Sequence, residues 1–222
     1  MEIGQVFDEI QEQYTQKMIR WVPHYQELIL LLATSFPENF SPGKILDLGS
    51  GNGNITATLL PVFYNAQFIL FDASTRMLEE AQKRFSDYSF QYQQGMMQEV
   101  HFEDASLDLI TASFSLHHLA GQQKKSIIDA AYRWLAPGGY FSYADLFINK
   151  NDPEHETFLE TWRQFVINHR VDGDWEYLSD HYNRYDFPDN LVTQLQWLSA
   201  LHFREIKLVI LDQYWVYIGA RK

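Results

Sequence analysis

The stretch Lys44–Thr56, KILDLGSGNGNIT, decides the fold that this sequence predicts. Residues 44–48 form a short apolar run that includes one acid, which is typical of a buried strand. Glycines then follow at alternate positions: Gly49, Gly51 and Gly53. Glycine permits positive φ and lets a ligand approach the backbone closely. From Ile55 the apolar residues have the spacing of a helix. The stretch therefore predicts the strand, turn and helix that open a nucleotide-binding α/β sheet.

The glycine spacing separates two classes of ligand. A dinucleotide fingerprint requires G-x-G-x-x-G, and its third glycine would fall on Asn54. The spacing G-x-G-x-G after Asp47 instead resembles the class I S-adenosylmethionine-dependent methyltransferases, and this resemblance extends over nearly the whole chain. It implies S-adenosylmethionine as the cofactor, with Asp47 orienting the loop and the amino-acid end of the cofactor. The loop residues expected to bind it are Gly49, Ser50, Gly51, Asn52 and Gly53.

Composition limits the remaining possibilities. The chain has 222 residues, enough for one large domain or a domain with a small cap. It has no cysteine, which excludes disulfides, thiolate nucleophiles and cysteine-ligated zinc, and we expect no bound metal. The net charge of −12 disfavours a nucleic-acid substrate. No apolar run is long enough to span a bilayer, so we expect a cytoplasmic protein without a membrane partner, and a homodimer is compatible with the sequence.

The ends of the next two predicted strands complete the expected cofactor site. Asp72 follows the strand 67–71 and lies 19 residues beyond Gly53, where an acid can accept both ribose hydroxyls. Its alternative role is to cap the helix 74–85. The third strand, 89–93, leads to Gly95, after which many relatives carry an acid that holds the adenine amino group. This chain has two thioethers there instead. The further residues assigned to the cofactor are Ala73, Met77, Gly95, Met96, Met97 and Ser113.

Two adjacent histidines follow the predicted fourth strand, 107–113, in the segment SFSLHHL. This strand ends opposite the methyl donor in the family, and the segment does not resemble the NPPY type that holds a nucleic-acid base. An imidazole with a pKa near neutrality can remove a proton from a hydroxyl or amine, so we expect His117 or His118 to be a general base. The alternative is that one histidine packs and the other binds a loop. Residues 136–139, APGG, predict a turn before the fifth strand, 140–147. Asp145, near the end of this strand, is expected in the substrate site or as a capping acid.

The N-terminal segment is expected to form part of a cap. Residues 3–35 predict two helices, separated at Pro23. The residues Met18-Ile19-Arg20 and Val22-Pro23-x-Tyr25 resemble the carboxy-S-adenosylmethionine synthase family, which implies that Tyr25 contacts the cofactor. Tyr14 is expected to contact the substrate. The alternative is that both tyrosines only pack the cap on the sheet.

Residues 150–187 interrupt the strand rhythm and are rich in aromatic side chains with interleaved arginines. Such a composition suits a lid over a small-molecule pocket, and its alternative is a helical cap with an aromatic core. Trp162 and Arg184 are the expected substrate contacts; Arg184 is also the nearest candidate for the arginine that pairs with the extra carboxylate in the carboxy-donor family. A helix at 191–201 and two alternating strands, 203–210 and 214–220, end the chain.

These features predict one α/β domain over residues 1–222 with cap elements at 1–35 and 150–187. The resemblance implies a Rossmann-like, seven-stranded, mostly parallel sheet with an antiparallel C-terminal hairpin and a helical cap. The expected function is methyl transfer from S-adenosylmethionine to a hydroxyl or amine of a small aromatic or apolar molecule. Three alternatives stay open: a carboxy-S-adenosylmethionine synthase-like enzyme, a non-catalytic cofactor-binding partner or regulator, and an NAD-dependent oxidoreductase.

Overall fold

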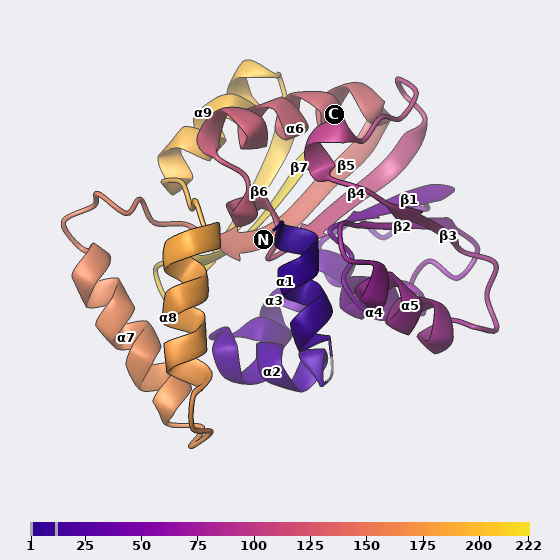
Figure 1. The fold of residues 1–222 in the computed structure, drawn as a ribbon. Coiled ribbons are helices and arrows are strands. Elements are labelled where there is room, and N and C mark those ends of the chain that lie inside the picture. The colour runs from indigo at the N-terminus through magenta and orange to yellow at the C-terminus, as the bar shows by residue number, and fades with distance from the viewer. Residues whose placement is uncertain (1, 12) are drawn as a thin grey trace.

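A seven-stranded sheet forms the centre of the computed structural model, which describes residues 2–11 and 13–222 (Figure 1). The strand order is β3-β2-β1-β4-β5-β7-β6. The strands are β1 (Lys44–Leu48), β2 (Gln67–Asp72), β3 (Gln91–Gln94), β4 (Leu107–Ser113), β5 (Leu135–Leu146), β6 (Arg204–Leu211) and β7 (Trp215–Arg221). Strands β1 to β5 pair in parallel, and β7 is antiparallel to both β5 and β6. The predicted mostly parallel sheet with an antiparallel C-terminal hairpin is confirmed.

Helices cover both faces of this sheet (Figure 1). The helices are α1 (Ile3–Ile10), α2 (Tyr14–Trp21), α3 (Tyr25–Thr34), α4 (Asn54–Leu59), α5 (Thr75–Arg84), α6 (Gly121–Trp134), α7 (His155–Ile167), α8 (Asp174–Tyr185) and α9 (Leu191–Ala200), with short 3₁₀ helices η1 (Met97–Glu99) and η2 (Leu116–His118). One buried cluster joins the sheet to α3, α4 and α5, and a second joins it to α6 and α9. The central strands are therefore buried on both faces, which explains their continuous apolar runs.

Helices from distant parts of the sequence form the cap. Figure 1 shows α1 and α2 on one side of α8 and α7 on its other side, at the edge of the molecule. The indole nitrogen of Trp162 donates a hydrogen bond of 2.6 Å to the carbonyl of Trp21. Arg20 forms an ion pair of 3.1 Å with Asp174 at the start of α8. The N-terminal and the central cap segments thus pack against one another.

Two local predictions require correction. Residues 3–35 contain three helices rather than two, because the chain turns at Gln13 with a positive φ of 56° as well as at Pro23. The last of these helices, α3, packs on the sheet through the fully buried Leu28 and Leu32. The predicted turn at 136–139 lies inside β5, where the pairing with β4 shifts register and Gly138 takes a φ of 88°. A bulge accommodates the residues that predict a turn.

Within the described residues, no helix combines the length and the apolar character needed to cross a membrane.

Candidate cofactor and acceptor site

The glycine loop between β1 and α4 has the backbone conformation that its sequence predicts. Gly49, Gly51 and Gly53 have φ values of 74°, 51° and 80°, which favour glycine. Asp72, at the end of β2, fixes the loop: its Oδ2 accepts a hydrogen bond of 2.8 Å from the Gly51 N–H. Its Oδ1 accepts one of 2.8 Å from the Ser74 N–H at the start of α5. Asp72 therefore joins the loop to the neighbouring strand end while its carboxylate borders the space above the loop.

Asp47 lies beneath the loop rather than above it. Its side chain is 1% exposed and accepts hydrogen bonds from the hydroxyls of Thr56, at 2.8 Å, and Thr111, at 3.3 Å. Burial raises the pKa of Asp47 to about 6 despite these hydrogen bonds. In this position the residue can orient the loop and α4, and it borders neither of the two cavities described below.

The raised pKa of Asp47 predicts a pH-dependent stability. The folded state takes up a proton at about pH 6 and the unfolded chain only near 3.8, so the contribution of this group to stability falls as the pH rises from about 4 to about 6. We expect Asp47→Asn to gain about 2 kcal/mol relative to the unmodified protein between pH values of about 4 and 8. Urea unfolding of both proteins across this range measures the difference. A constant difference would show that Asp47 does not titrate in this window.

A cavity of about 200 Å³, here called the loop cavity, lies above the glycine loop. Eight of the predicted cofactor residues line it: Gly49, Gly51, Asp72, Ala73, Met77, Met96, Met97 and Ser113. The remaining lining residues include several that sequence reasoning missed: Glu2, Ile3, Phe7, Gln98, Phe114, Ser115 and Leu119. The loop cavity therefore combines a glycine-rich floor, an acid at the end of β2 and thioethers, which suits a nucleoside with a charged tail.

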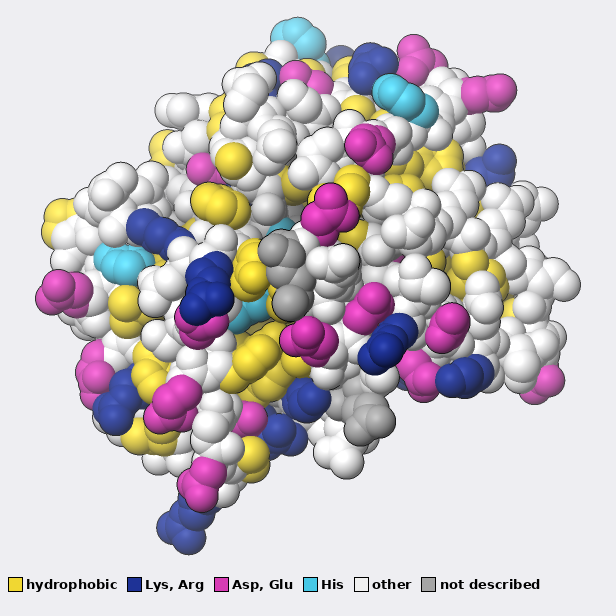
Figure 2. All heavy atoms as spheres, viewed as in Figure 1, with side chains coloured by type: hydrophobic (Ala, Val, Ile, Leu, Met, Phe, Trp, Pro, Cys, Tyr) yellow, Lys and Arg dark blue, Asp and Glu magenta, His cyan; other side chains and the backbone are white. Residues whose placement is uncertain are grey.

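A second, narrower cavity of about 60 Å³, here called the cap cavity, lies between the sheet and the cap helices. Its wall contains the predicted residues Tyr14, His117, His118 and Trp162. Aromatic and aliphatic side chains dominate the rest, among them Trp21, Phe114, Tyr177 and Trp215. Figure 2 shows hydrophobic side chains and part of a histidine in the gap between α8 and the α1–α2 pair. The cap cavity suits a small apolar or aromatic ligand.

The two cavities adjoin one another. Phe7, Tyr14, Phe114 and His118 line both of them. A ligand in the cap cavity would thus meet a ligand in the loop cavity at this shared wall. This contact is the arrangement that a transfer between two bound molecules requires.

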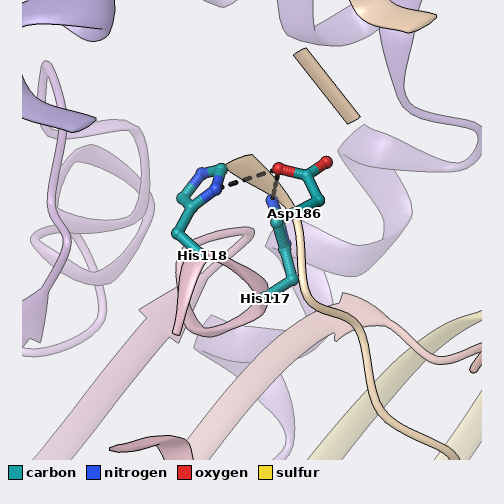
Figure 3. Close-up of side chains that lie close together, drawn as sticks. All are labelled: His117, His118 and Asp186. Atoms are coloured by element: carbon teal, nitrogen blue, oxygen red, sulfur yellow. Dashed lines mark ion pairs between the residues drawn. The ribbon is translucent and has the colours of Figure 1, made fainter. Parts of the chain in front are cut away.

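Histidines and carboxylates cluster at the shared wall (Figure 3). The Nδ1 atom of His117 forms a very short contact with the carboxylate of Asp145, whose Oδ2 also accepts from the His117 backbone N–H at 3.1 Å. On the other side, Oδ1 of Asp186 lies 3.0 Å from His118 Nδ1, 3.7 Å from His117 Nε2 and 3.3 Å from His181 Nε2. The predicted site residue Asp145 therefore holds His117, which lines the cap cavity, and does not border the cavity itself.

Burial and neighbouring charges set the protonation of this cluster. Burial disfavours a charge on His117, but Asp145 and Asp186 outweigh it and raise the pKa of His117. Burial, and then the adjacent His117, lower the pKa of His118 to about 4. Burial is the largest single effect on Asp145 and Asp186 and opposes their ionisation, but His117 and the other neighbouring donors and charges together outweigh it and lower the pKa of both. The two neighbouring imidazoles therefore differ strongly in basicity.

The other predicted site residues lie around or away from the cavities. Tyr25 and Ser50 line a small recess beside the loop, where the Tyr25 hydroxyl accepts a 2.8 Å hydrogen bond from the Asn54 amide. The Asn52 amide donates to the Thr15 hydroxyl at 3.2 Å and so joins the loop to α2. The predicted residues that border neither main cavity are Tyr25, Asp47, Ser50, Asn52, Gly53, Gly95, Asp145 and Arg184. Arg184 is exposed on α8 and pairs with Asp180 at 2.8 Å.

Sequence reasoning missed two members of the histidine cluster, His181 and Asp186. Both belong to residues 150–187, the segment that its aromatic content marks as a lid, but no spacing in it indicates which polar residues turn inward. Phe7 and Phe114 were also missed, although Phe7 belongs to an apolar stripe of α1 and Phe114 immediately follows β4. Phe114 could have been recognised from its position directly after a parallel strand, because ligands bind at the carboxyl ends of such strands.

Comparisons with known proteins relate the chain to methyltransferases. Residues 45–139 match a protein family described as a methyltransferase domain. The chain is 36% identical over 107 residues to an uncharacterized methyltransferase of Synechocystis sp., a match that covers 48% of this chain and 49% of the relative. It is 27% identical over 169 residues to the carboxy-S-adenosyl-L-methionine synthase of Vibrio cholerae, covering 72% of this chain and 67% of that protein. The chain spans about half the length of several curated relatives that it matches.

A solved structure agrees over the whole chain. The S-adenosylmethionine-dependent methyltransferase of Thermotoga maritima, described as a possible histamine N-methyltransferase, has a TM-score of 0.66 at 14% identity and covers 100% of both chains. This likeness shows the fold. Together with the family match over residues 45–139, it supports the predicted resemblance to the class I S-adenosylmethionine-dependent methyltransferases. S-adenosylmethionine is the cofactor of this class.

Proposed function

We propose that the protein transfers the methyl group of S-adenosylmethionine to a hydroxyl or amine of a small apolar or aromatic molecule. The observation that carries this proposal is the pair of adjoining cavities. S-adenosylmethionine would occupy the loop cavity, with its ribose hydroxyls at Asp72, and the acceptor would occupy the cap cavity. The nucleophile and the methyl group would then meet at Tyr14, Phe114 and His118.

The reaction requires alignment more than activation of the donor. The sulfonium of S-adenosylmethionine is already electrophilic, so the protein has to place the acceptor in line with the S–CH₃ bond and exclude water. Trp162, Trp21 and the other aromatic side chains of the cap cavity supply apolar walls for this purpose. The predicted role of His117 or His118 as a general base stays a proposal, supported by the position of both in the wall of the cap cavity.

A second candidate function is that of a carboxy-S-adenosylmethionine synthase-like enzyme. It is favoured by the match to the Vibrio cholerae protein. The arginine proposed to pair with the extra carboxylate, Arg184, lies on the surface and already pairs with Asp180, which does not support this alternative. A non-catalytic cofactor-binding role would leave the cap cavity without a substrate.

Binding and turnover test the proposed function. Calorimetry should show that the purified protein binds S-adenosylhomocysteine and does not bind NAD, because Asn54 replaces the third glycine of a dinucleotide fingerprint. Radiolabelled methyl groups should then move from S-adenosylmethionine to a member of a panel of small phenols, alcohols and amines. Tighter binding of NAD would contradict the cofactor. Cofactor binding with no labelled product from any acceptor would favour the non-catalytic alternative.

A further inference from the structure

We propose that His117, His118 and Asp186 form a binding site for a divalent transition-metal ion of the zinc class in the wall of the cap cavity. One atom of each residue can serve as a ligand, and the three atoms lie within 4.8 Å of one another. Figure 3 shows the two imidazoles directed toward the same carboxylate oxygen. The site differs from the sequence-based expectation that no metal is bound.

The spacing of the three atoms suits a shared ion. Asp186 Oδ1 lies 3.0 Å from His118 Nδ1 and 3.7 Å from His117 Nε2. In a tetrahedral zinc site, bonds of roughly 2.0–2.1 Å place neighbouring ligand atoms about 3.3 Å apart. The two measured separations lie on either side of that value. A small movement of the imidazoles would therefore place ligands at three of the four tetrahedral positions around an ion.

Hydrogen bonding does not account for this convergence. Asp186 is only 4% exposed, yet within the described residues its Oδ1 atom has no partner with hydrogen-bond geometry. The nitrogens of His118, His181 and His117 lie 3.0, 3.3 and 3.7 Å from it as ion-pair contacts without hydrogen-bond geometry, and His118 Nδ1 also lies 3.4 Å from the Tyr185 carbonyl oxygen. A buried carboxylate oxygen without a hydrogen bond is costly. A metal ion would satisfy it.

The surroundings of the cluster match the outer shell of a metal site. Asp145 binds His117 through Nδ1, which fixes the orientation of the ring and leaves Nε2 directed toward Asp186. A carboxylate behind a ligating histidine is a recurrent arrangement in metal sites. His181 approaches Asp186 at 3.3 Å from α8, and the ring of Phe7 packs against His118 and His181 at centroid distances of 5.3 and 5.9 Å.

Charge and ligand type indicate which ion the site would select. The side chains of Asp145 and Asp186 are 3% and 6% exposed, and two carboxylates at this depth require nearby positive charge. Lys124, which lies near Asp145, is already paired with Asp189 at 2.6 Å. Imidazole nitrogens suit zinc, cobalt and nickel, whereas magnesium prefers oxygen ligands. The set of two imidazoles and one carboxylate, open on one side, therefore favours a zinc-class ion.

The open position gives the ion a role that rests on the proposed function. Three protein ligands leave a fourth position, which an acceptor hydroxyl in the cap cavity can occupy. The bound hydroxyl would lose its proton to solvent as it binds, before water is excluded from the cavities. Its oxygen would then form a bond to the methyl carbon while the S–CH₃ electron pair returns to sulfur, which produces the methyl ether and S-adenosylhomocysteine. In this arrangement, His117 and His118 act as ligands and not as bases.

Metal titration of the untagged protein tests the site directly. Protein stripped with a chelator should bind one Zn²⁺ per chain by calorimetry and should give visible absorption with Co²⁺. Asp186→Asn should weaken Zn²⁺ binding by about 100-fold or more, and Asp145→Asn by roughly 10- to 100-fold. His169→Ala, which removes an exposed histidine outside the cluster, should retain the unmodified affinity. Circular dichroism verifies that each variant is folded.

Two results would overturn the site: no Zn²⁺ bound by the unmodified protein, or the same Zn²⁺ affinity in folded Asp186→Asn. Activity tests the role separately, because turnover should fall at least tenfold on stripping and return with Zn²⁺. Unchanged turnover in stripped protein would contradict activation of the acceptor by the ion and would favour a histidine base. Failure of both stripped and loaded protein to bind S-adenosylhomocysteine would instead contradict the proposed function, while the Zn²⁺ titration would still decide the metal site.

Discussion

Replacing Asp72 with alanine should weaken binding of S-adenosylhomocysteine by about 1.5–3 kcal/mol, roughly 10- to 150-fold. The carboxylate borders the loop cavity where the ribose hydroxyls would bind, so its removal deletes hydrogen bonds to a charged group. It also leaves the backbone N–H of Gly51 without its 2.8 Å acceptor, which loosens the loop itself. Calorimetry with S-adenosylhomocysteine measures the loss.

A control separates this effect from a general change of charge. Asp104→Ala removes an exposed acid outside both cavities and should leave the affinity unchanged. Thermal unfolding should show that the Asp72→Ala protein retains a cooperative transition. If the affinity of this variant equals that of the Asp104→Ala protein, Asp72 does not contact the cofactor and serves only to join the loop to β2.

Replacing Gly53 with alanine should lower the free energy of unfolding by about 2–4 kcal/mol. Gly53 has a φ of 80°, in which a side chain is strained, and it starts α4. An added Cβ would lie 2.4 Å from Cε2 of the Phe85 ring, so the ring or the loop has to move. Urea unfolding of the purified variant measures the combined cost of strain and overpacking.

Gly173 provides a matched control for this substitution. It has a φ of 85° and likewise precedes a helix, but an added Cβ would meet no described atom within 4 Å. Gly173→Ala should therefore cost only the conformational strain, about 1 kcal/mol. Equal losses in the two variants would mean that the Phe85 ring relaxes freely and that packing beneath the loop is not tight.

The sheet and the loop cavity could be predicted because their signals are local. The run of residues 44–48 and the glycines that follow set one strand and its turn, and parallel pairing then brings Asp72 and Ser113 to the same edge. The predicted turn at 136–139 was wrong because a bulge can hold the same residues within a strand. Local chemistry alone does not distinguish a turn from a bulge.

The histidine cluster could be predicted only in part because it depends on tertiary packing. His117 and His118 follow β4 and were recognisable from that position. Asp186 lies 68 residues later, and only the packing of the cap brings it to His118. Arg184, two residues earlier on the same segment, was expected in the site and instead faces solvent. The direction in which each side chain of α8 points is set by contacts with α1 and α2, which sequence spacing does not reveal.

The position of α1 has a consequence for how ligands enter and leave. Phe7 lines both cavities, and Asp8 holds the helix to the start of α5 through a 2.6 Å hydrogen bond from the Ser74 hydroxyl. Gly4 packs so closely that an added Cβ would lie 2.5 Å from the Ala73 carbonyl oxygen. On the proposed function, this one short helix would cover donor and acceptor together. The residence times of the spent cofactor and of the methylated product would then both depend on the detachment of that single segment.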